Sequence, residues 1–334
     1  MPLPNFITDY VACPETGSPL TQERDDLVNE YGIRYRVIDG IPRLLIPTKS
    51  AEEEKVRGMM QKFYEGVTFP GYDGIDSPSM LMDKATKSGF GRWLDEAIPP
   101  LASVLEVGCG TGQMTNFLGL VSTRKVMGID QSISSLLLGQ QFRERFDLKN
   151  VSFVQGNIFT LPAKNSSVDV LICSGVLHHT PDPEGGFKEL LKKVKKDGYI
   201  VIGLYNRYAR IPLGARKCLF RCTGGTLRWL DAHMRRRDVD KSKKEIWFTD
   251  QYRNPHESWH SVDEVLQWFT ECNVQFISGV PEIGGRVKDE TPQKQKLFER
   301  HPAGTPFQHV MKQLGWMFTI GREGGLFVLV GRKK

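Results

Sequence analysis

The sequence predicts an α/β fold in which helices cover both faces of a mostly parallel sheet. Two observations predict it. From Ser103 onward, short apolar runs alternate with helical stretches, and short turns join them. A glycine-rich turn, residues 108–112, follows the first of these runs. Strands that alternate with helices in this way form parallel sheets, and 334 residues leave room for additions around one such core.

Short apolar runs mark the strands of the expected sheet, and polar-apolar stretches mark its helices. The expected strands are 104–107, 126–129, 151–154, 168–172, 199–204, 274–277 and 326–330. The expected helices are 49–62, 114–120, 132–146, 186–195 and 307–318. A capping box, Ser261 with Glu264, predicts that a further helix starts there.

The chain divides into five expected segments. Residues 1–48 are expected to form a small β-rich domain, 49–102 a helical linker with an aromatic loop, and 103–206 the core. Residues 207–272 are expected to form a basic, mostly helical insertion after the fifth strand, and 273–334 to hold the last two strands and a helix between them.

Composition indicates an ordinary globular protein, with 40% hydrophobic and 25% charged residues. No apolar run approaches the roughly 18–20 residues of a membrane span. Residues 1–9 have neither the basic region nor the apolar core of an export signal. Six cysteines are too few for a disulfide framework in a chain of this length, so we expect a cytoplasmic protein.

The positive charge is concentrated in one segment. Residues 207–244 contain 12 Lys/Arg and 3 Asp/Glu, whereas the whole chain carries +6, so the remainder is net negative. The segment admits three interpretations: a solvated helical face, a contact with an anionic small molecule or a membrane surface, and a contact with nucleic acid. We recognise no RNA- or DNA-binding module, so we expect no DNA and rank RNA last.

The glycine-rich turn is the strongest functional signal. Gly108, Gly110 and Gly112 follow Glu106 in a G-x-G-x-G spacing, which lets backbone N–H groups approach a ligand at a helix start. A tight turn without a ligand is the alternative interpretation. The dinucleotide fingerprint G-x-G-x-x-G/A does not fit, because Gln113 occupies its last position. S-adenosylmethionine has no phosphate and tolerates this difference.

Polar residues follow three further strands at the carboxyl edge, where open α/β sheets bind ligands. Asp130 ends the second strand and can accept hydrogen bonds from both ribose hydroxyls. Asn157 follows the third strand, where its carbonyl can receive the adenine amino group, and Ser174 follows the fourth. Together with the glycine turn they predict a nucleoside-binding site.

Residues 103–206 resemble the class I S-adenosylmethionine-dependent methyltransferases, especially the small-molecule branch similar to quinone-biosynthesis methylases. The resemblance implies a Rossmann-like sheet and S-adenosylmethionine as cofactor. It places Glu106 near the methionine amino group, Asp130 at the ribose, and Asn157 (more often Asp) with Ile158 around the adenine. The expected cofactor-binding residues are Tyr64, Glu106, Gly108, Cys109, Gly110, Gly112, Gln113, Asp130, Gln131, Asn157, Ile158 and Ser174.

The first segment resembles a different domain. Residues 12–14 and 35–42 are similar to the small zinc-ribbon-like domain of certain methyltransferase activators. A structural zinc needs four Cys/His ligands, but Cys13 stands alone and Thr16 occupies its partner's position. We therefore predict that the small β fold remains without metal, and we expect no metal site elsewhere in the chain.

An oxygen acceptor needs a base near its hydroxyl, and the candidates are His178 and His179, just after the fourth strand. A structural role for one or both histidines is the alternative. Tyr205 ends the fifth strand and should face the acceptor. In the polar loop 248–260, His256 and Glu257 are further catalytic candidates; Pro255 and a missing third ligand argue against metal there.

These residues predict an enzyme that transfers a methyl group to a small, possibly anionic acceptor, with oxygen slightly preferred to nitrogen or carbon. Residues 207–272 are expected to cover the acceptor, and an aromatic loop, 63–72, either folds over the cofactor or packs against the core. Two alternatives remain: methylation of RNA or a membrane-associated acceptor through 207–244, and a non-catalytic S-adenosylmethionine-binding regulator. The sequence predicts neither the acceptor nor the oligomeric state.

Overall fold

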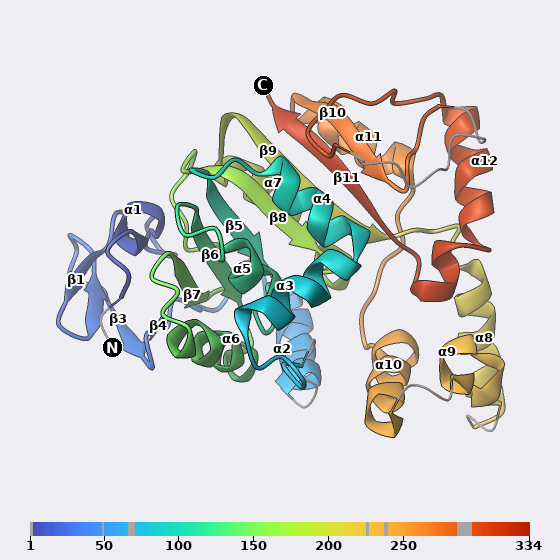
Figure 1. Cartoon of the computed structure of the whole chain (residues 1–334), viewed down its shortest axis with the longest axis horizontal. Helices are drawn as coiled ribbons and strands as arrows, with labels where there is room; N and C mark the ends of the chain where they lie inside the picture. The colour runs from blue at the N-terminus through green and yellow to red at the C-terminus, as the bar shows by residue number, and fades with distance from the viewer. Residues whose placement is uncertain (1–2, 49, 66–70, 225–226, 237–239, 286–295) are drawn as a thin grey trace.

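The computed structural model describes residues 3–48, 50–65, 71–224, 227–236, 240–285 and 296–334, apart from a few side chains within helices. Its centre is a seven-stranded sheet of order β10-β11-β9-β8-β5-β6-β7, and a four-stranded sheet lies at its β7 side (Figure 1). The predicted α/β fold is confirmed.

Five of the seven strands are parallel. They are β5 (Ser103–Val107), β6 (Lys125–Asp130), β7 (Val151–Gln155), β8 (Val168–Ser174) and β9 (Val194–Tyr205). The last two strands are β10 (Val274–Val280) and β11 (Leu326–Lys333). β11 runs antiparallel to both β9 and β10, so the late strands complete the sheet at its other edge.

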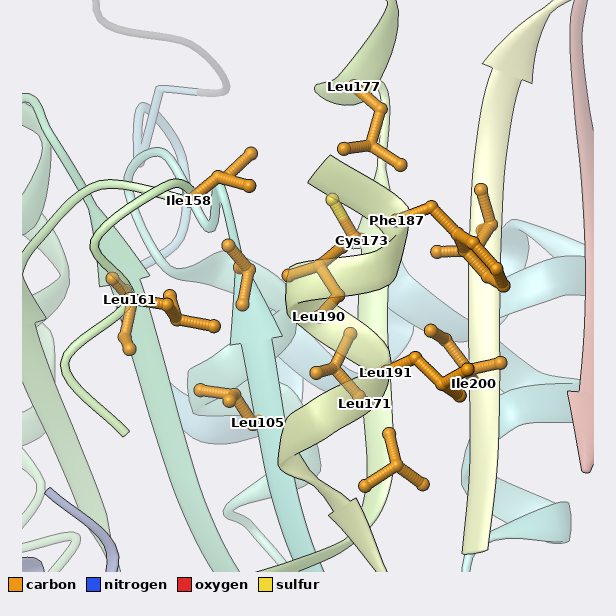
Figure 2. Packing of buried hydrophobic residues seen from close by; sticks show 14 of the residues in the cluster. Leu105, Ile158, Leu161, Leu171, Cys173, Leu177, Phe187, Leu190, Leu191 and Ile200 are labelled. Carbon is orange, nitrogen blue, oxygen red and sulfur yellow. The ribbon is translucent and has the colours of Figure 1, made fainter. Parts of the chain in front are cut away.

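Helices cover both faces of this sheet. On one face lie α3 (Pro78–Lys87), α4 (Gly89–Ala97), α5 (Gln113–Leu118) and α6 (Ile133–Arg145). On the other face lie α7 (Pro183–Lys193) and α11 (Val262–Glu271). Figure 2 shows Phe187 and Leu190 of α7 facing Leu171 and Ile200 of the strands beneath. Strands buried on both faces explain the continuous apolar runs of the sequence.

Helix boundaries follow capping side chains. The predicted capping box at Ser261 is present and starts α11. The helix predicted over 186–195 starts earlier, at Pro183, because the Asp182 side chain accepts a hydrogen bond from the Gly185 N–H. A second capping box, Thr305 with Gln308, starts α12 (Pro306–Trp316).

The first segment forms a separate small sheet that protects an edge of the large one. After α1 (Ile7–Tyr10), four antiparallel strands follow: β1 (Thr21–Glu23), β2 (Asp26–Val28), β3 (Arg34–Ile38) and β4 (Ile41–Pro42). Arg43 pairs with Gln155 at the end of β7, and the Leu44 N–H donates to the Gln155 carbonyl (3.0 Å). The small sheet therefore covers part of the otherwise open β7 edge.

Hydrogen bonds stabilise the turn after Cys13. In a zinc-ribbon domain a metal ion would be bound at this position. The Tyr35 hydroxyl lies 3.1 Å from the Cys13 sulfur and donates to the Glu15 carboxylate (3.0 Å). Asn29 donates to the Ser18 hydroxyl (3.2 Å). In the described ranges, no three His, Cys, Asp or Glu side chains are grouped so as to hold a metal ion. The zinc-ribbon resemblance itself stays a prediction.

The expected insertion, 207–272, holds α8 (Ile211–Cys222), η2 (Arg228–Leu230), α9 (Ala232–Arg235) and α10 (Lys241–Arg253), and its last helix, α11, packs on the sheet instead. Leu213, Phe220, Phe248 and Tyr252 form the insertion's own small core. The remaining helix, α2 (Ala51–Glu65), precedes α3. Among the helices that the structure describes, none combines the length and apolar character needed to cross a bilayer.

Replacing Tyr35 by Phe should lower the free energy of unfolding by about 1–2 kcal/mol, because the hydroxyl that joins Cys13 and Glu15 is lost from a partly buried site. Urea unfolding of the purified protein measures this change. The matched control is Tyr31→Phe, since Tyr31 is 69% exposed and should change the unfolding free energy by less than about 0.5 kcal/mol.

Metal analysis of the purified, tag-free protein should find less than about 0.1 equivalent of zinc, because Cys13 lacks ligand partners. One equivalent of zinc that disappears in Cys13→Ser would show that this domain has been misinterpreted.

Candidate active site

The turn after β5 has a backbone that only glycine adopts readily. Gly108, Gly110 and Gly112 have φ of 73°, 54° and 70°. An added Cβ on Gly108 would lie 2.2 Å from Val176, and one on Gly112 would lie 2.2 Å from Phe153. The turn is therefore fixed by both conformation and space, and it leads directly into α5.

Asp130 ties this turn to the next strand. Its carboxylate accepts hydrogen bonds from the N–H groups of Gly110 and Ser132, each at 2.8 Å. Burial raises the pKa of Asp130 above its usual value. Each carboxylate oxygen has two acceptor positions, so the group can also accept bonds from a diol such as ribose.

Glu106 lies beside the turn, where the Thr115 hydroxyl donates to its carboxylate. Burial raises the pKa of Glu106 to about 7, although the bond from Thr115 opposes this shift. A cation placed beside the carboxylate would favour the ionised form. Glu106 is thus suited to receive a ligand ammonium group.

Asn157 offers a buried donor in addition to the acceptor oxygen that the sequence suggested. Its side-chain oxygen already accepts from the Phe159 N–H (3.3 Å), which fixes the orientation of the amide. The amide nitrogen is buried, and no described atom accepts from it. A ring nitrogen of a base would satisfy this NH₂ group, whereas the sequence had suggested a bond from the adenine amino group to the oxygen. Ile158 beside it is buried in the cluster of Figure 2.

Several other expected cofactor residues are engaged within the protein. Gln113 donates to the Gly71 carbonyl (2.6 Å). The Gln131 carbonyl accepts from the Gln155 side chain (3.0 Å). Cys109 is buried at the turn.

The aromatic loop before α3 is described only in part. Residues 66–70 and the side chain of Tyr64 lie outside the described residues. Tyr72 packs against Phe142 of α6, with ring centroids 5.1 Å apart, and its hydroxyl accepts from Asn116 (2.8 Å). Of the two roles that the sequence allowed for this loop, the ring of Tyr72 therefore has the second, packing against the core.

The two adjacent histidines differ in their partners. Both lie in η1 (Leu177–His179) after β8. His179 donates from Nδ1 to the carbonyl of His256 (2.8 Å). His178 is fully buried and stacks on Tyr205 (3.8 Å between centroids), and neither of its ring nitrogens has a hydrogen-bond partner within the described residues. Burial, with smaller effects of nearby cationic groups, lowers the pKa of His178 well below its usual value.

The end of the insertion holds the histidine turn in place. The Ser258 N–H donates to the carbonyl of His178 (2.7 Å), and the Ser258 hydroxyl bonds to His260 (2.8 Å). His260 in turn bonds to Glu264 (2.8 Å). His256 donates from Nε2 to the Thr180 carbonyl (3.1 Å). These residues position His178 rather than contact its ring.

Glu257 lies behind Tyr205, as the counter-ion of a buried arginine. The Arg210 guanidinium lies 3.7 Å from the Tyr205 ring centroid, on the face opposite His178, since both groups cannot occupy one face. Glu257 pairs with Arg210 (2.9 Å) and Lys217 (3.3 Å), and the Arg210 and Glu257 side chains are 1% and 7% exposed. The sequence suggested Glu257 for chemistry and did not reveal Arg210.

Tyr252 lies in the polar segment 248–260 but faces the interior of the insertion. Its hydroxyl bonds to Asp231 within the small core of the insertion, so its ring belongs to that core.

An apolar pocket of about 290 Å³ opens beside Ser174. It is lined by Phe90, Ser174, Val280, Pro281, Ile320, Leu326 and Val328. Leu326 is the β11 partner of Tyr205, so both side chains leave the sheet on the same face. A Cβ on Gly203 would lie 2.2 Å from the Ser174 hydroxyl, so glycine is needed beside it. Leu326 thus links the lining of the pocket to Tyr205, the ring on which His178 stacks.

The comparisons identify the family. The methyltransferase domain family matches residues 100–273, just over half of the chain. The protein therefore belongs to the class I S-adenosylmethionine-dependent methyltransferases, and S-adenosylmethionine is the cofactor of this family.

Two curated relatives and one solved structure are similar to parts of the chain. The demethylmenaquinone methyltransferase of Bacillus mycoides (strain KBAB4) is 30% identical over 156 residues, 46% of this chain and 63% of that protein. An uncharacterized Synechococcus protein, syc1184_c, is 24% identical over 197 residues, 52% of this chain and 47% of its own. The chain thus spans about half to two-thirds of these relatives. The PKMT2 structure from Rickettsia typhi, 13% identical, covers 70% of this chain and 49% of that one with a TM-score of 0.51, and supports the fold.

Replacing Glu257 by Gln should lower the free energy of unfolding by about 3–5 kcal/mol, because Arg210 then lies buried without its carboxylate. Urea unfolding measures the change. The control is Glu299→Gln in the exposed pair with Lys296, which should change it by less than about 1 kcal/mol. If Glu257→Gln kept full stability but lost turnover, Glu257 would act on the acceptor itself.

Proposed function

We propose that the protein transfers the methyl group of S-adenosylmethionine to a small molecule, with oxygen preferred to nitrogen or carbon as the acceptor atom. One observation carries this proposal: His178 is buried, its two ring nitrogens lack partners in the described chain, and it stacks on Tyr205, whose strand partner Leu326 lines an apolar pocket. When bound, the cofactor supplies an electrophilic methyl group for in-line displacement.

The residues around the glycine turn suit this cofactor. In the proposal, Glu106 pairs with the methionine ammonium group, Asp130 accepts from the ribose hydroxyls, and the free NH₂ group of Asn157 donates to an adenine ring nitrogen. The support is the raised pKa of Glu106, the outward acceptor capacity of Asp130 and the buried donor of Asn157.

His178 is the proposed base. Its lowered pKa keeps the ring neutral at pH 7, so one ring nitrogen can accept a proton from the acceptor hydroxyl as the new bond forms. A weak base of this kind suits an acidic hydroxyl, such as a phenol or quinol with a pKa of about 10, better than an alkyl alcohol.

The pocket lining favours the same class of acceptor. Its side chains are apolar except for the Ser174 hydroxyl, which suits an aromatic ring with few polar groups. The similarity to demethylmenaquinone methyltransferases also points to a quinol-like ring. Within the expected insertion, 207–272, the part before α11 is proposed to cover this acceptor, because His256 and Ser258 bond to the histidine turn.

The affinity for S-adenosylmethionine should rise about tenfold between pH 5.5 and pH 7. Glu106, with a pKa of about 7, is mostly protonated at the lower pH and half ionised at the higher one, and only the ionised form attracts the ligand ammonium. In Glu106→Gln this pH dependence should vanish, and affinity at pH 7 should be lower. Calorimetry at both pH values measures the dissociation constants.

Glu96→Gln, at an exposed position, is the matched control and should keep the pH dependence. Asp130→Ala should abolish binding. Absence of heat with both S-adenosylmethionine and S-adenosylhomocysteine, beside clear binding of NAD, would contradict the cofactor assignment.

Replacing His178 by Phe should reduce turnover by about 10²–10⁴-fold, because the stack on Tyr205 is kept and the proton acceptor is removed. Turnover is measured as S-adenosylhomocysteine formed with a panel of phenols and reduced quinones. At saturating S-adenosylmethionine, the wild-type rate should stay level from pH 8 to pH 6.5 and fall only at lower pH, since His178 protonates well below its usual range.

His301→Gln is the control, because this histidine lines neither the pocket nor the glycine turn. Full turnover in His178→Phe would exclude His178 as the base. Cofactor binding without turnover on any member of the panel would favour the non-catalytic regulator.

A further inference from the structure

Helix α12 presents an apolar stripe to solvent. Phe307, Met311 and Leu314 are 75%, 53% and 39% exposed, and Phe318 just beyond the helix is 69% exposed. They are spaced by four, three and four residues, so they lie along one side of the helix. No charged residue belongs to this stripe.

The opposite side of α12 is fixed by buried polar contacts. The side-chain oxygen of Gln313 accepts from the Asn206 side chain (2.8 Å) and from the Val262 N–H (2.9 Å). His309 bonds to Asp263 (2.7 Å). Because these buried groups would lose their partners if α12 rotated, the helix cannot turn its apolar stripe inward.

A second apolar stripe lies on α8. Ile211 and Leu219 are 47% and 38% exposed, and Trp229 of η2 is 58% exposed. The chain that follows α12 contacts the chain that precedes α8: a Cβ on Gly321, three residues after Phe318, would lie 2.5 Å from the Ala209 carbonyl. Figure 1 places α12 and α8 along the same side of the molecule.

This side gathers much of the exposed apolar surface. Thirteen large hydrophobic side chains are exposed among the described residues, and seven of them belong to α8, η2 and the α12 stripe. We call these seven the apolar face: Ile211, Leu219, Trp229, Phe307, Met311, Leu314 and Phe318.

Basic residues accompany the apolar face. Between Arg207 and Arg236 the sequence has a single acidic residue, Asp231, and its side chain is buried. Arg221 of α8 and Arg235 of α9 are exposed. Helices that lie in the interface of a membrane with anionic lipids typically expose Phe, Leu and Trp beside Arg and Lys.

We infer that the apolar face docks on the surface of an anionic lipid bilayer. Asn206, which bonds to α12, directly follows Tyr205, so docking brings the acceptor side of the site close to the membrane. The docking itself does not depend on the proposed function; only its consequence, access to a lipid-soluble acceptor, rests on that proposal.

The test is sedimentation of the full-length protein with vesicles, without cofactor or acceptor. Vesicles of phosphatidylcholine with about 30% phosphatidylglycerol should bind the protein at least about tenfold more strongly than phosphatidylcholine alone, and added salt should weaken this binding. The double variant Phe307→Ser, Phe318→Ser should bind at least about tenfold more weakly. The matched control is Tyr31→Ser, Leu101→Ser, at residues 69% and 82% exposed, and should bind as the wild type does.

Cofactor binding by calorimetry should be unchanged in both double variants, which shows that they are folded and separates this test from the proposed function. Equal binding of the wild type and Phe307→Ser, Phe318→Ser to the vesicles, or no binding by either, would overturn the inference. A dimer in solution that this double variant dissociates, without vesicle binding, would also overturn it, because a second copy would then cover the face.

Discussion

The buried charge of Arg210 is the constraint on which the acceptor side depends. A guanidinium removed from water is costly unless it is paired and hydrogen-bonded. Arg210 meets this requirement with Glu257 from the end of the insertion, Gln251 from α10 and the Gly324 carbonyl before β11. Two distant parts of the chain, 251–257 and 324, therefore converge on one side chain. Its face supports Tyr205, and its charge disfavours a protonated ring on His178 beyond it.

Two groups of the site have pKa values displaced in opposite directions. The pKa of Glu106 is raised to about 7, so the stability that Glu106 contributes is present at acid pH and is lost as the pH rises toward 7. The pKa of His178 is lowered, so its contribution is present above about pH 6.5 and is lost as the pH falls below that value. The two slopes therefore oppose each other over the pH range that they share. Near neutrality the site holds a neutral histidine and a carboxyl group that is about half ionised.

Local patterns in the sequence predicted the elements, but they could not predict the pairings between distant elements. Apolar runs located the strands, and Ser261 with Glu264 located the start of α11, because these signals lie within a few residues. The role of Glu257 was not visible, since its partner Arg210 lies 47 positions away. The pocket was not visible either, because Phe90, Pro281 and Ile320 come from three separate segments. The spacing of residues 307–318 predicted a helix, but it gave no indication that the apolar side faces solvent.

The apolar side of α12 faces solvent because of contacts made by the last residues of β9 and the residue after it. Consecutive residues of an extended chain point to opposite sides, so Tyr205 and Asn206 serve different neighbours. Tyr205 leaves the sheet on the pocket side, whereas Asn206 donates to Gln313 and holds the polar side of α12 inward. Once Gln313 and His309 are buried against Asn206 and Asp263, the apolar residues of α12 have only the outer side left. One pair of adjacent residues therefore supports both the proposed acceptor pocket and the apolar face, and the two surfaces are joined through a rigid strand end.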